Sequence, residues 1–177
     1  LGKALKILRK YGDVARVLAG GTDLITLIEE DLVSPEIVVD LKGIEDLGDI
    51  REKDGRIQIG ALVTFSELQD SPLIRKHFPT MWEMTHWVAS VGIRNRATMV
   101  GNICSAVPCC DSGPILLVHE AVVHVRSAAG KRKVTMADWF KGPRKTVLRK
   151  NEMVTGVSVT IVKGAQGGRL ARLPGDR

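Results

Sequence analysis

The chain has 177 residues, of which 44% are hydrophobic and 26% are charged, as in one folded domain or two small ones. This composition excludes disorder, and no apolar run approaches the roughly 18 residues that span a bilayer. No secretory signal pattern opens the chain, so we expect a cytoplasmic protein that does not contact a membrane. The net charge is +6, but nine basic and two acidic residues lie beyond position 140, and the first 140 residues carry −1.

This distribution argues against nucleic acid as a partner. Only seven aromatic residues occur, and none is interleaved with the C-terminal basic cluster as a base-stacking surface requires. We interpret the basic end as solvated, with docking to an acidic partner subunit as the less favoured alternative.

The first 49 residues predict a helix followed by a strand–helix–strand unit. The expected order is a helix over Lys3–Tyr11 ended by Gly12, a strand over Arg16–Ala19, a helix capped by Thr22 or Asp23, and a strand over Ile37–Leu41. The unit is slightly short for a parallel crossover.

The pattern then changes to hairpins and helices. Asp54-Gly55 predicts a tight hairpin between strands Ile50–Lys53 and Arg56–Gly60, and Thr64 with Glu67 forms a capping box. Further elements are helices after Ser71-Pro72 and over Thr80–Ser90, and strands over Ala121–Val125, Lys133–Thr135 and Thr155–Val162. Residues 163–177 predict a tail or the stub of a further domain.

Two glycine-containing turns have residues that could bind a ligand. The first, Leu18–Leu24, has two glycines between a strand and a helix, where consecutive backbone N–H groups can cradle an anion. The second, Arg94–Asp111, predicts an irregular connection whose small polar side chains suit sugar hydroxyls and phosphates. Each alone is more simply a structural connection, but together they could grip a diphosphate from two sides.

Several motifs occur in a fixed order over most of the chain. They are Ala19–Leu24, Gly60–Leu68, Ile93–Ile103 followed by Pro108 and Asp111, and Phe140–Met153. With these motifs the chain resembles the FAD-binding (medium) subunit of the molybdenum hydroxylases, of the xanthine dehydrogenase, carbon monoxide dehydrogenase and 4-hydroxybenzoyl-CoA reductase type.

The resemblance implies an α+β protein with the p-cresol methylhydroxylase-type FAD-binding fold. Its expected parts are an α/β N-terminal subdomain over residues 1–49, a second FAD-binding subdomain over residues 50–162 with a mostly antiparallel sheet and helices, and residues 163–177 as a tail or the stub of a missing C-terminal domain. FAD would lie extended between the two subdomains.

The resemblance also implies the residues that bind FAD. They are Leu18, Ala19, Gly20, Gly21, Thr22, Asp23 and Leu24 in the first turn, Thr98, Gly101 and Asn102 in the second, Asp111 toward cofactor hydroxyls, and Val154 as an apolar contact to the flavin. No catalytic side chain and no metal ligand is assigned.

The implied function is electron transfer by an oxidoreductase subunit. Electrons would pass from the 2Fe–2S clusters of a small subunit to this flavin and on to NAD+ or another acceptor, with substrate handled by a molybdopterin-binding large subunit. The alternative is a flavin-free assembly or interaction protein that retains the fold.

Three departures from the family pattern bear on that choice: two substitutions, and the absence of the family's further C-terminal domain. The missing domain and Val100 raise the alternative, because together they would leave the flavin site empty. Gly92 stands where the family has glutamine, and Val100 stands where it has glycine. Valine cannot adopt positive φ cheaply, so Val100 either has ordinary dihedrals with its side chain turned away, or lowers flavin affinity. Under the flavin-binding hypothesis Val100→Gly changes FAD affinity little, whereas under the alternative it creates binding.

The remaining conspicuous residues have structural interpretations. Cys104, Cys109 and Cys110 are too few for an iron–sulfur site and are expected near the flavin. His119 and His124 lack a third ligand. The aromatic helix residues Trp82 and Trp87, together with Met84, are expected to pack a helix against the sheet.

Overall fold

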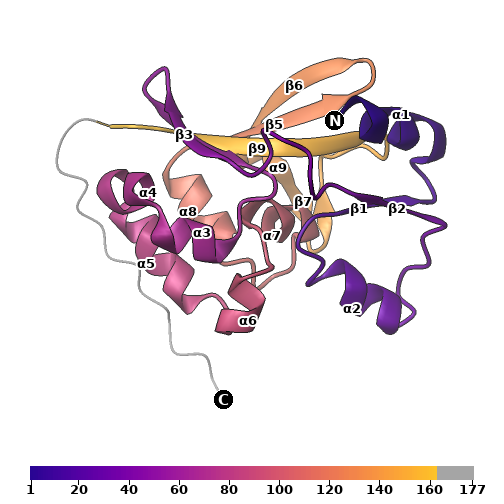
Figure 1. The fold of residues 1–177 in the computed structure, drawn as a ribbon, viewed down its shortest axis with the longest axis horizontal. Coiled ribbons are helices and arrows are strands. Elements are labelled where there is room, and N and C mark those ends of the chain that lie inside the picture. Colours follow the sequence, from indigo (N-terminus) through magenta and orange to yellow (C-terminus); the bar gives the residue numbers. More distant parts are fainter. Residues whose placement is uncertain (163–177) are drawn as a thin grey trace.

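The computed structural model describes residues 1–162, so the predicted tail or stub at 163–177 lies outside the described residues. A five-stranded antiparallel sheet is covered on one face by helices, and a two-stranded parallel sheet lies beside it (Figure 1). This is the predicted α+β arrangement of a parallel N-terminal unit followed by an antiparallel sheet with helices.

The N-terminal unit pairs its two strands in parallel. Its elements are α1 (Gly2–Tyr11), β1 (Ala15–Leu18), α2 (Leu24–Glu29) and β2 (Ile37–Asp40). Leu18 of β1 lies opposite Asp40 of β2, which confirms the strand–helix–strand prediction. Asp23 is the N-cap residue of α2, one of the two predicted, but its carboxylate makes no capping hydrogen bond.

The large sheet has the spatial order β3-β4-β9-β5-β6. Its strands are β3 (Ile50–Lys53), β4 (Arg56–Gly60), β5 (Val122–Ser127), β6 (Gly130–Thr135) and β9 (Glu152–Thr160). The hairpin between β3 and β4 is confirmed, with φ of +52° at Asp54 and +69° at Gly55. The central strand β9 begins three residues before the predicted Thr155 and is buried over nearly its whole length.

Seven helices and a small hairpin complete the described chain. They are α3 (Phe65–Asp70), α4 (Pro72–His77), α5 (Pro79–Trp87), α6 (Val91–Arg94), α7 (Met99–Ser105), α8 (Ser112–Val118), α9 (Met136–Trp139), β7 (Phe140–Gly142) and β8 (Lys145–Thr146). The capping box of α3 is confirmed, since Thr64 N donates to Glu67 Oε2 at 2.7 Å and Glu67 N donates to Thr64 Oγ1 at 3.2 Å.

The prediction of an irregular connection over residues 94–111 is wrong, because α7 lies within it. Thr98 Oγ1 accepts a hydrogen bond from Gly101 N at 2.9 Å and caps the helix. Three apolar residues of this short helix, Met99, Val100 and Ile103, are buried. A capped turn with one buried side is therefore enough to order a segment whose polar composition resembles a loop.

Two apolar clusters meet at β9. The larger joins inward-facing residues of the sheet, such as Ile57, Val123 and Val157, to the covering helices. The smaller joins α1, β1 and β2 and includes Met153 of β9. Because β9 supplies side chains to both clusters, it is buried on both faces. Among residues 1–162, no helix is long and apolar enough to cross a membrane.

Candidate functional site

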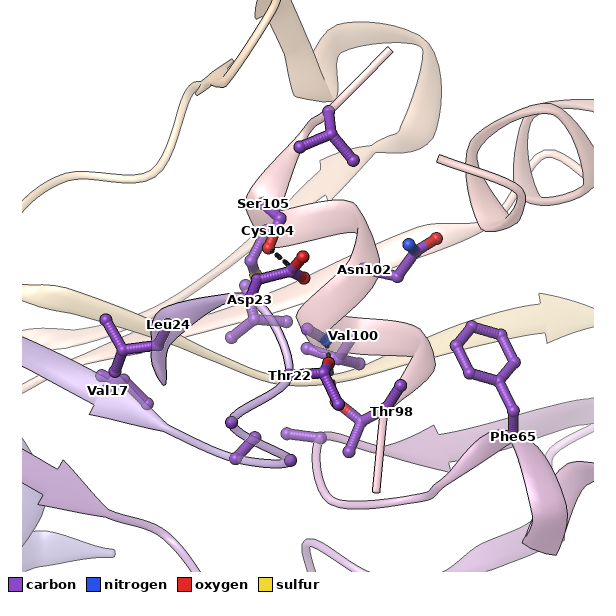
Figure 2. Close-up of a pocket in the computed structure, with 18 of the residues that line it drawn as sticks. Val17, Thr22, Asp23, Leu24, Phe65, Thr98, Val100, Asn102, Cys104 and Ser105 are labelled. Carbon is purple, nitrogen blue, oxygen red and sulfur yellow. Dashed lines mark hydrogen bonds between the residues drawn. The ribbon is translucent and has the colours of Figure 1, made fainter. Parts of the chain in front are cut away.

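A cavity of about 550 Å³ lies where the N-terminal unit meets α7 (Figure 2). Eleven of the twelve residues predicted to bind FAD line it: Ala19, Gly20, Gly21, Thr22, Asp23, Leu24, Thr98, Gly101, Asn102, Asp111 and Val154. The tertiary structure thus brings together two turns that are far apart in the sequence. That these residues bind the cofactor remains a prediction.

The two turns pack directly on each other at Gly20. A Cβ atom at this position would lie 1.8 Å from the backbone oxygen of Arg96, so only glycine allows this approach. Gly21 has a φ of +88°, a conformation that side-chain-bearing residues rarely adopt. Each position therefore requires glycine for its own steric reason. A simple connection between a strand and a helix would not need glycine at both positions.

The first turn offers backbone donors to the cavity. Within residues 1–162, no atom accepts a hydrogen bond from the backbone N–H groups of Gly20, Gly21 or Thr22. The carbonyl of Gly21, by contrast, accepts from Ile25 N at 2.9 Å at the start of α2. Because backbone N–H groups in proteins are almost always paired, three such donors lining one cavity fit an anionic group such as a diphosphate.

Asp23 connects the two turns through its side chain. Its Oδ2 accepts a hydrogen bond of 2.7 Å from the hydroxyl of Ser105, the last residue of α7 (Figure 2). Asp23 therefore ties α2 to α7 rather than capping α2. This contact holds the first turn against the last residue of α7.

A double-mutant cycle measures this connection. We expect Asp23→Ala and Ser105→Ala to be coupled by about 1–2 kcal/mol in the free energy of unfolding, since the hydrogen bond is charge-assisted and half-buried. Urea unfolding of the single and double variants gives the coupling energy. Additive effects of the two substitutions would show that the hydrogen bond does not hold the turns together.

Asn102 is oriented by the start of α8. Its Oδ1 accepts hydrogen bonds from Ser112 N and from Cys110 Sγ, both at 3.1 Å. This fixes which end of the amide points toward α8 and leaves the Nδ2 hydrogens without a partner among the described residues. Asn102 can therefore donate to an oxygen of a ligand in the cavity.

Val100 is the second residue of α7, and its side chain is 4% exposed. Helical dihedrals are accessible to valine, so the first of the two sequence alternatives holds for the backbone. The side chain is not wholly turned away, because it lines the cavity as well as the core. Val100→Gly would thus empty part of the core, and it does not isolate flavin affinity as the sequence suggested.

The far wall of the cavity is the start of β9, where Met153 and Val154 line it. Glu152, which precedes them, is 7% exposed and accepts hydrogen bonds from Arg132 Nε at 2.8 Å and Nη2 at 2.7 Å. A third donor is Arg149 N at 2.9 Å. The hydrogen bonds from Arg132 hold the pKa of Glu152 below its usual range despite burial. This ion pair fixes the strand that forms the wall.

Leu18 is the one predicted residue that does not line the cavity. Its carbonyl accepts a hydrogen bond from Leu41 N at 3.0 Å, so the chain there still follows the parallel sheet.

Most of the apolar residues that line the cavity were not predicted from the sequence. These residues are Val17, Leu27, Leu41, Ala61, Phe65, Val88, Ala89, Ile93, Ala97, Val107 and Leu148. Ala61, Ile93 and Ala97 lie inside the motifs that carry the resemblance, so the sequence did contain a signal that could have predicted them as lining residues.

Two of the cysteines, Cys104 and Cys109, line the same cavity. Burial raises the pKa of Cys104 to about 12 and that of Cys110 to about 11, so both thiols stay protonated at neutral pH. Within residues 1–162, no three His, Cys, Asp or Glu side chains are grouped so as to hold a metal ion. His119 lies 3.3 Å from Thr80, and His124 lies 2.8 Å from Ser158.

Comparison with known proteins agrees with this geometry. The family model described as the FAD binding domain in molybdopterin dehydrogenase matches residues 1–159. The glyceraldehyde dehydrogenase medium chain of Sulfolobus acidocaldarius is 31% identical over 93% of this chain and 58% of its own length. The nicotinate dehydrogenase FAD-subunit of Eubacterium barkeri is 32% identical over 90% of this chain and 55% of its own length.

Solved structures share the fold. A chain of carbon monoxide dehydrogenase from Hydrogenophaga pseudoflava has a TM-score of 0.89 and 29% identity, over 99% of this chain and 62% of that one. Quinoline 2-oxidoreductase from Pseudomonas putida 86 has a TM-score of 0.88 and 29% identity, over 92% of this chain and 57% of that one. The chain thus spans less than two thirds of the length of these relatives. It belongs to the family of FAD-binding domains of molybdopterin dehydrogenases, and its cofactor is FAD.

Proposed function

We propose that this chain is the FAD-binding part of an oxidoreductase subunit that transfers electrons within a molybdenum hydroxylase complex. Its partners would be a molybdopterin-binding large subunit and a 2Fe–2S small subunit, with NAD+ or another carrier as acceptor. The names of its relatives, a medium chain and a FAD-subunit of two dehydrogenases, support this assignment. So does a cavity lined by Gly20, Gly21 and Thr22, whose backbone N–H groups have no partner within residues 1–162.

The observation that carries the proposal is the pairing of the two turns. Gly20 lies against the backbone of Arg96, and the N–H groups of the first turn, which have no partner within residues 1–162, belong to residues that line the cavity. These donors would hold the diphosphate, and the Nδ2 group of Asn102 would donate to an oxygen of the cofactor. Apolar side chains, among them Phe65 and Val154, would exclude water from the flavin ring.

Bound FAD supplies the one- and two-electron redox chemistry that no side chain of this chain provides. The chain's own contribution is to bind and orient the cofactor. We expect the large subunit to carry the substrate specificity, because it is the subunit that would hold the molybdopterin.

A visible absorption spectrum tests the proposal. We expect the purified chain, incubated with FAD and passed through gel filtration, to retain a structured flavin band at close to one FAD per chain. A folded chain that elutes colourless would contradict flavin binding by these turns. It would favour the alternative that the chain is a flavin-free interaction protein, which no feature of the cavity supports.

A further inference from the structure

Six exposed cations gather at one end of the molecule, away from the FAD cavity. Three belong to α1 and three to the hairpin of β5 and β6: Lys6, Arg9, Lys10, Arg126, Lys131 and Lys133. Arg126 lies directly opposite Lys131 in the hairpin. The neighbouring valines, such as Val125 and Val134, face the helical layer, so these cations point from the other face of the sheet. Figure 1 shows α1 beside this hairpin.

None of these six cations forms an ion pair with any residue of the described chain. Other cations are paired, for example Lys42 with Asp40 and Arg132 with Glu152. Asp13, an acidic residue that closely follows α1, is held by Lys150. The positive charge at this end is therefore uncompensated, although residues 1–140 as a whole are nearly neutral.

Three of these cations, Lys6, Arg9 and Lys10, line a hollow of about 530 Å³ between α1 and the turn of the hairpin. It is lined by Gly2, Leu5, Lys6, Arg9, Lys10, Ser127 and Ala128. Three of these residues are basic, none is acidic, and Leu5 and Ala128 add apolar surface. A concave surface with an apolar floor and a basic rim can seat side chains that carry carboxylates on short aliphatic stems.

We propose that this hollow, together with the six cations, is the docking surface for an acidic segment of a partner subunit. The inference rests on the proposed function, in which the chain works inside a complex. Carboxylates seated here would supply the counter-charges that residues 1–162 do not provide to these cations. A protein segment is favoured over nucleic acid because no Phe, Trp or Tyr lines the hollow on which a base could stack.

A charge reversal with a matched control tests this surface. The test variant carries Lys6→Glu and Lys131→Glu, and the control carries Lys53→Glu and Lys76→Glu. All four lysines are exposed and free of ion pairs within residues 1–162, and both variants change the net charge equally. The control positions lie on β3 and α4, at the opposite end of the molecule from α1 (Figure 1).

The measurement is the dissociation constant between the chain and the co-purified large and small subunits of its complex, at several salt concentrations. We expect the test variant to weaken assembly by about tenfold or more at low salt, by less at high salt, and the control by no more than about twofold. Retention of FAD is recorded for each protein, so loss of the flavin site is seen separately from loss of docking.

Four results would overturn the proposal. Equal weakening by both variants would show that only net charge matters, and unchanged assembly in both would show that the hollow is not an interface. Wild-type binding to a DNA duplex or to phosphatidylglycerol vesicles that the test variant loses, with assembly intact, would assign the surface to another partner. If the wild-type chain retains FAD but never assembles with the two subunits, the proposed complex fails, and this surface with it.

Discussion

Gly20→Ala is expected to abolish retention of FAD. The new methyl group would lie 1.8 Å from the backbone oxygen of Arg96, and a backbone atom cannot move aside as a flexible side chain can. The two turns must then separate, which displaces the donors of the first turn from those of the second. We also expect the free energy of unfolding to fall by about 1–3 kcal/mol, as in other overpacked sites.

Gly48→Ala is the matched control for this substitution. A Cβ atom at Gly48 meets nothing within 4 Å, and this glycine does not need a positive φ. The control should retain FAD and unfold at the same urea concentration as the wild type. The flavin absorption after gel filtration and the urea midpoint are measured on all three proteins. A Gly20→Ala chain that still carried one FAD would show that contact between the turns is not required for the site.

Glu152→Gln is expected to destabilise the protein by about 2 kcal/mol at pH 7. Removing one partner of a buried ion pair typically costs about 3–5 kcal/mol, and the cost is lower here because the Arg132 side chain is 33% exposed. The neutral amide cannot accept from Arg132 and from Arg149 N as the carboxylate does. Met153 and Val154 then lose their support, so FAD retention should weaken as well.

The pH dependence of the same variant has a defined sign. The pKa of Glu152 in the folded state lies below its ordinary value of 4.5, mainly because Arg132 donates to the ionised form. Its contribution to stability is therefore complete above pH 4.5 and is lost as the pH falls through the lower, folded-state pKa. Glutamine does not titrate. The difference in the free energy of unfolding between wild type and variant should therefore become smaller as the pH falls through that range.

Urea unfolding at pH 7 and at steps below pH 4.5 measures this difference. Glu45→Gln serves as control, because Glu45 is exposed and has no ion pair within the described part of the chain. It should change stability little at any pH. A difference for Glu152→Gln that stays constant down to pH 3 would mean that the ion pair with Arg132 does not stabilise the fold.

The fold class and the predicted FAD-binding residues followed from the ordered motifs in which the chain resembles a known family, and single elements followed from local sequence signals. The Asp54-Gly55 hairpin and the capping box of Thr64 and Glu67 were predicted and are present, because each depends on residues close together in the chain. Eleven of the predicted binding residues line the cavity, because the motifs that carry the resemblance lie in the segments that form it. The identity of FAD as cofactor was likewise contained in the order of those motifs.

Only the tertiary structure decided how the two turns meet. Helix α7 was hidden in a polar segment, since its order depends on burial against strands distant in sequence. Asp23 looked like a helix cap until its bond to Ser105 placed it between the turns. The basic hollow beside α1 was equally invisible, because net charge along a chain does not report which cations a fold leaves unpaired.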